Sequence, residues 1–261
     1  MTSPDLAQTR AQVHHGSFEA LRRRPVVLGL VGLLTLVVAV VAGVALGTVG
    51  IPLGETVAIL AHRMGLDVEQ TWAGSSETIV VTLRLPRVLT ALVVGLGLSV
   101  AGVTFQGLLR NPLADPYIIG TASGAALGAA IGVLLPIQLH WLGLGLTNIL
   151  AFVGALAAVS VVYRVAGGGG RSTMTSILLT GYAVGSMLAA GLSLAMYLSG
   201  AQLRQIFFYI MGSLNGADWQ SLSVGLPVIA IGSLLILARA RSLNGLLLGD
   251  DTALHLGVYV R

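Results

Sequence analysis

The sequence predicts an all-α fold, a polytopic bundle of transmembrane helices, and two observations carry this prediction. The 261 residues are 55% hydrophobic and only 9% charged, whereas soluble domains usually carry about 25% charged residues. Six apolar runs without a charged residue follow one another along the chain, and about 20 such residues cross a bilayer. A soluble core of this size cannot bury so much apolar surface, so lipid is the expected solvent for much of the chain.

The chain begins with a polar tail, residues 1–24, which ends in three consecutive arginines. Pro25 suits the first position of a helix, and the apolar run after it, 26–48, predicts the first span. A cleaved signal peptide is the alternative, because a positive flank before an apolar run also fits one. The run is longer than the usual apolar core of a signal peptide and further spans follow, so a retained span is favoured.

The remaining apolar runs complete a predicted transmembrane domain over residues 25–241. Between the first two runs the chain is mixed in character, and Pro52 opens what we expect to be a short helix at the membrane interface. After the last span, residues 242–261 form a short amphipathic segment. The five further predicted spans cover residues 88–109, 117–139, 143–163, 173–199 and 220–238.

Glycine recurs at every fourth position of the third predicted span, at Gly120, Gly124, Gly128 and Gly132. This spacing places a smooth stripe on one helix face, where another backbone can approach closely. The stripe predicts a packing seam between helices.

The distribution of arginine predicts the orientation, because cytoplasmic loops of membrane proteins carry an excess of positive charge. All fourteen basic residues are arginines. Six alternating spans with the N-terminus inside place most of them in the cytoplasm, together with the turn at Asn111–Asp115 and the segment 242–261. The segment Arg84–Arg87 is then external.

The composition argues against several classes of function. Without cysteine and lysine, the chain has no thiolate metal site, no Walker A loop and no Schiff-base amine. The His, Asp and Glu residues show no metal-ligand spacing, and the arginines do not cluster as a nucleic-acid site requires. We therefore expect no metal, no cofactor and no catalytic residue.

The apolar runs also lack the ionisable groups that ion-coupled carriers commonly keep in the membrane. This observation weighs modestly against a secondary transporter, because backbone carbonyls alone can bind Na⁺. A transporter without coupling chemistry of its own must receive energy through a cytoplasmic contact. A membrane scaffold or an inactive truncated remnant is the alternative from another class.

Residues 248–257 are the candidate contact segment. Asp250 or Asp251 can cap a short helix and complement its dipole, and Ala253, Leu254 and Leu256 supply an apolar face after it. Such a helix suits the groove of a partner protein. On these grounds alone, a helix lying on the membrane surface is equally favoured.

Three segments together resemble the FecCD-type permease family, the ABC importers of ferric siderophores, haem and cobalamin. They are Arg84–Gly95, then Gln106–Tyr117 running into Gly120–Gly128, and finally Leu248–Gly257. The resemblance covers residues 25–261 and implies the ABC type II importer permease fold, with ten spans in each subunit. The chain stops just after the third segment, so it is expected to be a fragment or a truncated gene product that carries six of the ten.

The resemblance implies a role for each matching segment. Arg84 and Arg87 match external arginines that dock the substrate-binding protein, although arginines at such positions also anchor spans at the lipid headgroups. The fifth span lines the path in this family, so Thr180, Ser186 and Ser193 are path candidates, with a helix seam as the alternative. The residues implied in ATPase coupling are Gly249, Asp250, Asp251, Thr252, Ala253, Leu256 and Gly257. Those expected to shape the turn into the third span are Asn111, Pro112, Asp115, Gly120, Gly124 and Gly128.

Together these expectations describe a non-catalytic translocation subunit in the bacterial cytoplasmic (inner) membrane, multi-pass and with a cytoplasmic N-terminus. It would import a metal chelate, a ferric siderophore in the first place and cobalamin or haem as alternatives. The implied partners are a second permease subunit, identical or different, a cytoplasmic ABC ATPase dimer, an extracytoplasmic substrate-binding protein and membrane lipid. No nucleic acid is expected to bind.

Overall fold

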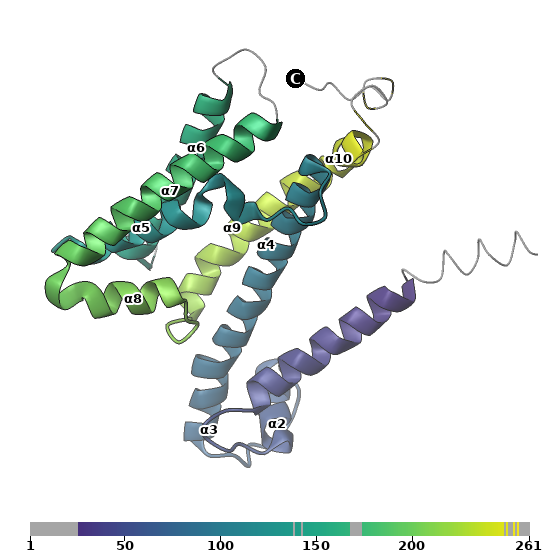
Figure 1. The fold of residues 1–261 in the computed structure, drawn as a ribbon. Helices are drawn as coiled ribbons and strands as arrows, with labels where there is room; N and C mark the ends of the chain where they lie inside the picture. The colour runs from purple at the N-terminus through teal and green to yellow at the C-terminus, as the bar shows by residue number, and fades with distance from the viewer. Residues whose placement is uncertain are drawn as a thin grey trace, which may run out of the picture. The chain divides into compact units, whose positions relative to one another are not determined.

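The computed structural model describes residues 26–137, 139–141, 143–167, 174–247, 249, 253 and 255, and these are mainly helical (Figure 1). The chain divides after Val88 into two units, residues 1–88 and 89–261. The first helix covers Val26–Ala45. The following elements are α2 (Leu53–Arg63), α3 (Gly74–Thr78), the π-helix η1 (Ile79–Arg84), α4 (Leu85–Leu109), the 3₁₀ helix η2 (Pro116–Ile119), α5 (Thr121–Leu134), β1 (His140–Trp141), β2 (Leu144–Gly145), α6 (Leu146–Gly167), α7 (Met174–Leu198), η3 (Gly200–Gln202), α8 (Leu203–Met211), α9 (Trp219–Ala238) and α10 (Ala240–Leu247).

Five helices in the described part of the chain are long and apolar enough to cross a membrane. They cover Val26–Ala45, Gly74–Leu109, Leu146–Gly167, Met174–Leu198 and Trp219–Ala238. The span expected over residues 117–139 is instead the 14-residue helix α5. At about 1.5 Å per residue, α5 is roughly 21 Å long and shorter than the hydrocarbon core of about 30 Å. The 3₁₀ turn η2 precedes it, and the antiparallel pair β1–β2 follows it.

The first unit has a small core of its own, formed by Val44, Ile51, Ile59, Trp72 and Val80. The short helix expected after Pro52 is α2, whose Ile59 is fully buried in this core. The indole nitrogen of Trp72 donates to Glu77 at 3.2 Å. Glu77 also pairs with Arg63 at 2.7 Å. Through these two contacts Glu77 links Arg63 of α2 to Trp72 of the apolar core.

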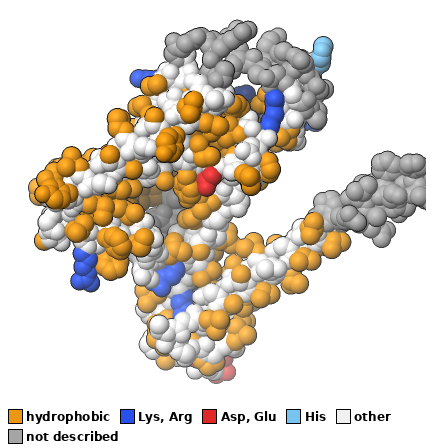
Figure 2. All heavy atoms as spheres, in the orientation of Figure 1, with side chains coloured by type: hydrophobic (Ala, Val, Ile, Leu, Met, Phe, Trp, Pro, Cys, Tyr) orange, Lys and Arg blue, Asp and Glu red, His pale blue; other side chains and the backbone are white. Residues whose placement is uncertain are grey.

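In the second unit, α5 packs against α6 along the glycine stripe. A Cβ atom added to Gly128 would lie 2.8 Å from the carbonyl carbon of Leu150, and one added to Gly132 would lie 2.6 Å from the Cα of Thr147. Real Cβ atoms do not approach backbone this closely, so only glycine permits the observed spacing of the two helices. Hydrophobic side chains cover much of the visible face of the second unit (Figure 2), as expected where lipid replaces water.

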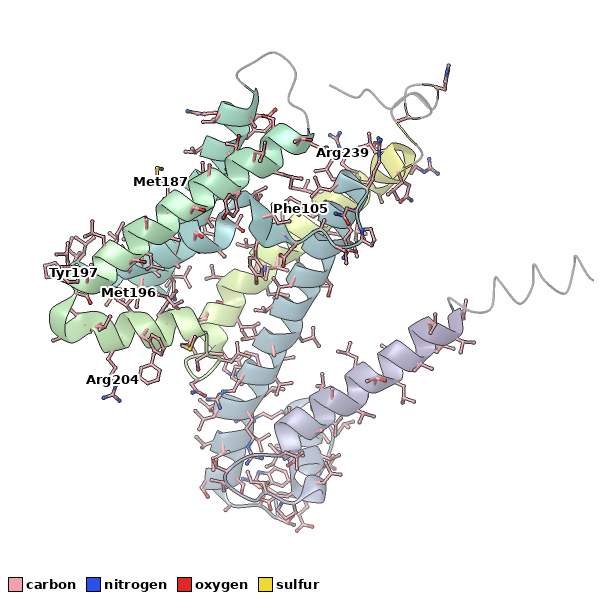
Figure 3. The ribbon with its side chains drawn as sticks, viewed as in Figure 1. Phe105, Met187, Met196, Tyr197, Arg204 and Arg239 are labelled. Carbon is pink, nitrogen blue, oxygen red and sulfur yellow. The ribbon has the colours of Figure 1, made fainter. Side chains whose placement is uncertain are left out.

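The helix α8 is short and joins α7 to α9. The hydroxyl of Tyr209 on α8 donates to the side-chain oxygen of Asn148 on α6 at 2.7 Å, and burial raises the pKa of this tyrosine. Arg204 extends away from the ribbon (Figure 3) and lies 5.5 Å from the ring of Phe208. The carboxylate of Asp218 caps α9 by accepting from the Ser221 backbone N–H at 2.8 Å, and this hydrogen bond lowers its pKa.

Candidate coupling, docking and path residues

Arg84 lies at the C-terminal end of the π-helix η1 and is only 8% exposed. One guanidinium nitrogen donates to the carbonyl oxygens of Val44 at 3.1 Å and of Ala45 at 2.6 Å, and the other donates to the Val49 carbonyl oxygen. The last carbonyls of a helix have no partner inside it, and a positive charge is favourable there. The side chain therefore caps the first helix.

In this structure Arg84 acts as a helix cap, and its expected role in docking a binding protein stays a prediction. An arginine that docks a protein in solution must present its charge at the surface, whereas this charge is turned inward onto main-chain oxygens. Arg87, one helical turn further along, is half-buried. A docking role for Arg87 stays a prediction.

The turn after α4 is held by its own side chains. The Asn111 side-chain oxygen accepts from the Leu113 N–H at 2.9 Å, and the Asp115 carboxylate accepts from the Tyr117 N–H at 2.8 Å. Asp115 is thereby the N-cap of η2, with Pro116 at the first position of that helix. Gly120 follows with φ of 77°, a left-handed conformation that glycine adopts without strain, and it starts α5. These two side-chain hydrogen bonds hold the turn locally.

The three path candidates on α7 do not share one face. Successive helical residues turn by about 100°, so Ser186 and Ser193 lie about 20° apart while Thr180 lies about 120° from Ser186. Both serines are exposed and Thr180 is half-buried. Ser193 also donates to the Ala189 carbonyl oxygen within its own helix, at 3.0 Å. The structure thus groups Ser186 with Ser193 and separates Thr180 from them.

A different face of α7 packs against the start of the third predicted span. A Cβ atom on Gly181 would lie 2.6 Å from the Ile118 carbonyl oxygen, and one on Gly120 would lie 3.3 Å from the Cα of Gly185. Met187 and Tyr197 point away from the neighbouring ribbons (Figure 3) and are 67% and 85% exposed. Glycine therefore marks the packed side of α7 better than serine or threonine does.

The predicted coupling segment is described at three positions only. Gly249 has φ of 105°, Ala253 is fully buried and His255 is exposed. The Ala253 N–H donates to the Gly249 carbonyl oxygen at 2.9 Å, the four-residue spacing of one α-helical turn. Asp250, Asp251, Thr252, Leu256 and Gly257 lie outside the described residues.

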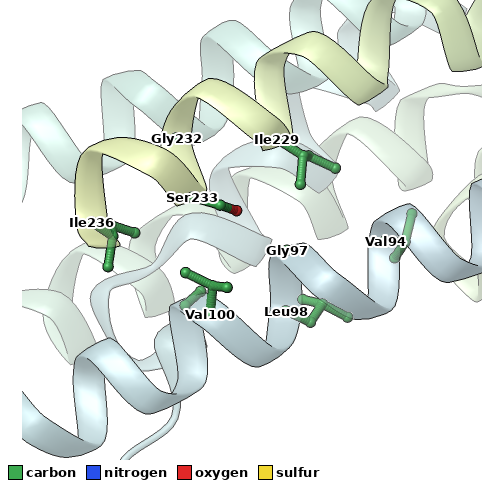
Figure 4. A pocket seen from close by; sticks show the side chains of 9 residues that line it. Val94, Gly97, Leu98, Val100, Ile229, Gly232, Ser233 and Ile236 are labelled. Carbon is green, nitrogen blue, oxygen red and sulfur yellow. The ribbon is translucent and has the colours of Figure 1, made fainter. Parts of the chain in front are cut away.

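A shallow apolar groove of about 340 Å³ lies between α4 and α9. Gly97, Val94 and Leu98 line one wall, and Ile229, Gly232 and Ser233 line the other (Figure 4). Gly97 brings the helices together, because a Cβ atom there would lie 3.2 Å from Ile229. No group of three or more His, Asp or Glu residues in the described part of the chain could hold a metal ion.

One residue that was not predicted from the sequence connects the turn after α4 with α10. Arg110, at the start of the turn, donates from Nε to the carbonyl oxygen of Leu246 in α10, at 2.6 Å. Its partner is 136 positions away in the sequence, and no local pattern indicates such a pairing.

Comparison with known proteins identifies relatives of this chain. A cobalamin import system permease protein of Halobacterium salinarum is 39% identical over 186 residues, which cover 71% of this chain and 49% of the relative. A hemin transport system permease protein of Yersinia pestis is 41% identical over 181 residues, 69% of this chain and 54% of the relative. The chain thus spans about half the length of these two curated relatives.

A solved structure has a fold similar to that of this chain. It shows a protein assigned to the metal-chelate type of ABC transporter in an inward-facing conformation, with a TM-score of 0.71 and 27% identity. The match covers 90% of this chain and 68% of that one. The profile of the FecCD transport family matches residues 34–261. The chain is therefore a multi-pass membrane protein that belongs to the FecCD transport family.

Proposed function

We propose that this chain is the membrane-spanning permease part of an ATP-driven ABC importer for metal chelates, with a ferric siderophore as the first candidate cargo. Energy comes from ATP hydrolysis on a partner ABC ATPase dimer in the cytoplasm. A second permease subunit completes the pathway, and an extracytoplasmic binding protein delivers the cargo. The chain itself makes and breaks no covalent bond.

The observation that carries the proposal is the family match over residues 34–261, on a chain that has five helices suited to a bilayer. The names of its relatives support the class of cargo, because they include import systems for cobalamin, hemin and Fe(3+)-citrate. A relative from Haemophilus influenzae is named for molybdate import. An oxyanion is therefore the cargo to compare with the chelates.

The proposed contact with the ATPase is the segment Gly249–Gly257. Its described residues begin a helical turn at Gly249, and its apolar Ala253 is buried. We place this segment and the tail 1–24 in the cytoplasm, as the arginine distribution favours. Of the two proposed docking arginines on the opposite side, Arg84 and Arg87, Arg87 is the less buried.

The proposed path runs along the exposed face of α7 that carries Ser186 and Ser193. Small hydroxyl side chains leave room for a bulky cargo and offer weak hydrogen bonds. Such a surface would select little by itself. In this proposal the binding protein therefore supplies most of the specificity.

The test is uptake by the assembled transporter in proteoliposomes, with the ABC ATPase enclosed and the binding protein outside. We expect radiolabelled ferric hydroxamate, cobalamin or haem to accumulate only when ATP is enclosed, while molybdate does not. Uptake that persists without ATP and collapses with an ion gradient would instead establish a secondary carrier. A folded chain that binds no ATPase in detergent would identify an inactive remnant.

A further inference from the structure

We propose that Arg110 is a positioning residue that ties the turn after α4 to the end of α10, so that displacement of the coupling segment reaches α5. The inference rests on the proposed function, because it assumes that force enters at residues 249–257. The first observation is the hydrogen bond from Arg110 Nε to the Leu246 carbonyl oxygen, at 2.6 Å. In Figure 1 the end of α4 accordingly lies beside α10.

The acceptor of this bond belongs to the last turn of α10, where carbonyl oxygens have no partner within the helix. A charged donor forms a stronger hydrogen bond than a neutral one, and positive charge is favourable at a helix C-terminus. Arg110 therefore caps α10 from a distant part of the chain. The bond holds two segments together that the backbone does not connect locally.

The same carbonyl oxygen also holds the start of the coupling segment. The Gly249 N–H donates to Leu246 at 3.2 Å, and the Ala253 N–H donates to the Gly249 carbonyl oxygen at 2.9 Å. Arg110 and Gly249 thus share one acceptor. A movement of Gly249 away from α10 therefore acts directly on the Leu246 carbonyl oxygen, which is also the acceptor for Arg110.

On its other side Arg110 begins a turn that is held by local hydrogen bonds. The Arg110 N–H donates to Gly107, the Asn111 N–H to Gln106 and the Ala114 N–H to Asn111, at 3.3, 3.1 and 3.0 Å. Asp115 then caps η2, which leads through Gly120 into α5. These local hydrogen bonds form a continuous connection from Arg110 to α5, so we expect a displacement of Arg110 to reach α5.

The backbone of Arg110 supports a functional reading. Its φ is 49°, the one positive φ at a non-glycine residue in the part of the chain that the structure describes. The left-handed conformation raises the conformational free energy of a non-glycine residue, and strained residues of this kind are frequent at functional sites. Glycine would fit this backbone without strain. A long cationic side chain at this position is therefore explained by what the side chain binds.

The key variant is Arg110→Gly, which keeps the backbone conformation and removes the link. Its matched partners are Arg110→Ala, which removes the link and keeps the strain, and Arg110→Lys, which keeps a charged donor. In the assembled transporter we measure cargo imported per ATP hydrolysed. We expect Arg110→Gly and Arg110→Ala to lower this ratio about tenfold, the effect of one charge-assisted hydrogen bond, and Arg110→Lys to restore most of it. An unchanged ratio in Arg110→Gly overturns the proposal.

A second measurement does not depend on transport. The chain has no cysteine, so spin labels can be placed through Leu113→Cys and His255→Cys, two positions with exposed side chains. We expect a narrow distribution of label distances with Arg110 and a broad one with Arg110→Gly. Equal distributions overturn the link even if transport is ATP-driven, whereas absence of ATP-driven uptake in the unmodified assembly refutes the proposed function alone.

Discussion

The guanidinium of Arg84 donates a 2.6 Å hydrogen bond to the carbonyl oxygen of Ala45, the last residue of the first helix. It thereby fixes the end of that helix to the π-helical turn that precedes α4. Gly47 makes room for it, because a Cβ atom at Gly47 would lie 2.6 Å from a guanidinium nitrogen. A cation inside an apolar unit is stable here because main-chain oxygens replace its water.

We predict that Arg84→Ala destabilises the protein by about 2–3 kcal/mol, since it removes charge-assisted hydrogen bonds and leaves helix-end carbonyls without their donor. Thermal unfolding in detergent measures the effect. The control is Arg63→Gln, which removes an ion pair at an arginine that is 58% exposed. Such pairs contribute at most about 1 kcal/mol. Equal shifts in Tm for the two variants would show that Arg84 does not act as a cap.

Arg87→Glu tests the proposed docking of the binding protein at the less buried of the two arginines. A charge at the rim of an interface changes the association rate and its salt dependence more than the final affinity. We expect the binding protein to associate about tenfold more slowly with the reconstituted transporter at low salt, and the difference to shrink as salt screens the charge. Stopped-flow binding at several ionic strengths measures this. A salt-independent effect would point to lost structure rather than lost steering.

Gly128→Ala is expected to separate α5 from α6. The added methyl group would meet the backbone at Leu150, which cannot yield as a side chain can, so we expect a loss of about 1–3 kcal/mol. The matched control is Gly95→Ala in α4, where the new methyl group would meet no atom within 4 Å beyond its neighbours and the local backbone of its own helix. There alanine should be neutral or stabilising, because it favours a helix. A loss of stability in both variants would contradict the packing argument.

The glycine stripe shows what the sequence predicts well. Regular spacing at every fourth residue defines a helix face, and a face of glycines admits only a close backbone neighbour. The extent of a helix is harder to predict. A charge-free run begins at Val88, yet the continuous helix begins at Gly74, because an arginine can lie within a helix when backbone oxygens solvate it.

The roles of the two buried or tethered arginines could not be predicted for a related reason. Arg84 and Arg110 bind main-chain carbonyl oxygens. Every residue carries such an oxygen, so the residue type does not indicate which residue is the partner. The left-handed backbone of Arg110 could not be predicted from the sequence either, because glycine or asparagine is the usual indicator of that conformation. Side chains that bind their own local backbone, such as Asn111 and Asp115, were predictable from residue type.

Replacement of Ser186 and Ser193 by tryptophan tests the proposed path. Both serines lie on one exposed face of α7, so a bulky ring at either position should reduce cargo uptake by the assembled transporter at least about tenfold, through steric exclusion. Leu194→Trp is the control, because this exposed leucine is about 100° from Ser193 on the same helix. Equal inhibition by all three variants would place the path elsewhere.

The coupling segment provides the most direct test of how energy enters. We predict that Asp250→Ala, Asp251→Ala and Leu256→Ala together strongly weaken copurification of the ABC ATPase and ATP-driven uptake. The triple change removes both the cap of the proposed helix and its apolar contact. A few anchor residues carry most of the binding energy of an interface, so we expect at least a tenfold loss of affinity, about 1.4 kcal/mol.

The control for this segment is His255→Gln, which alters an exposed side chain of the same turn and should leave the association intact. The side of the membrane on which this segment lies can be tested independently with His255→Cys, because the chain has no other cysteine. A membrane-impermeant thiol reagent should label this position only from the cytoplasmic side. Labelling from outside the cell would place the segment beyond the reach of any ATPase, and energy could not enter the permease there.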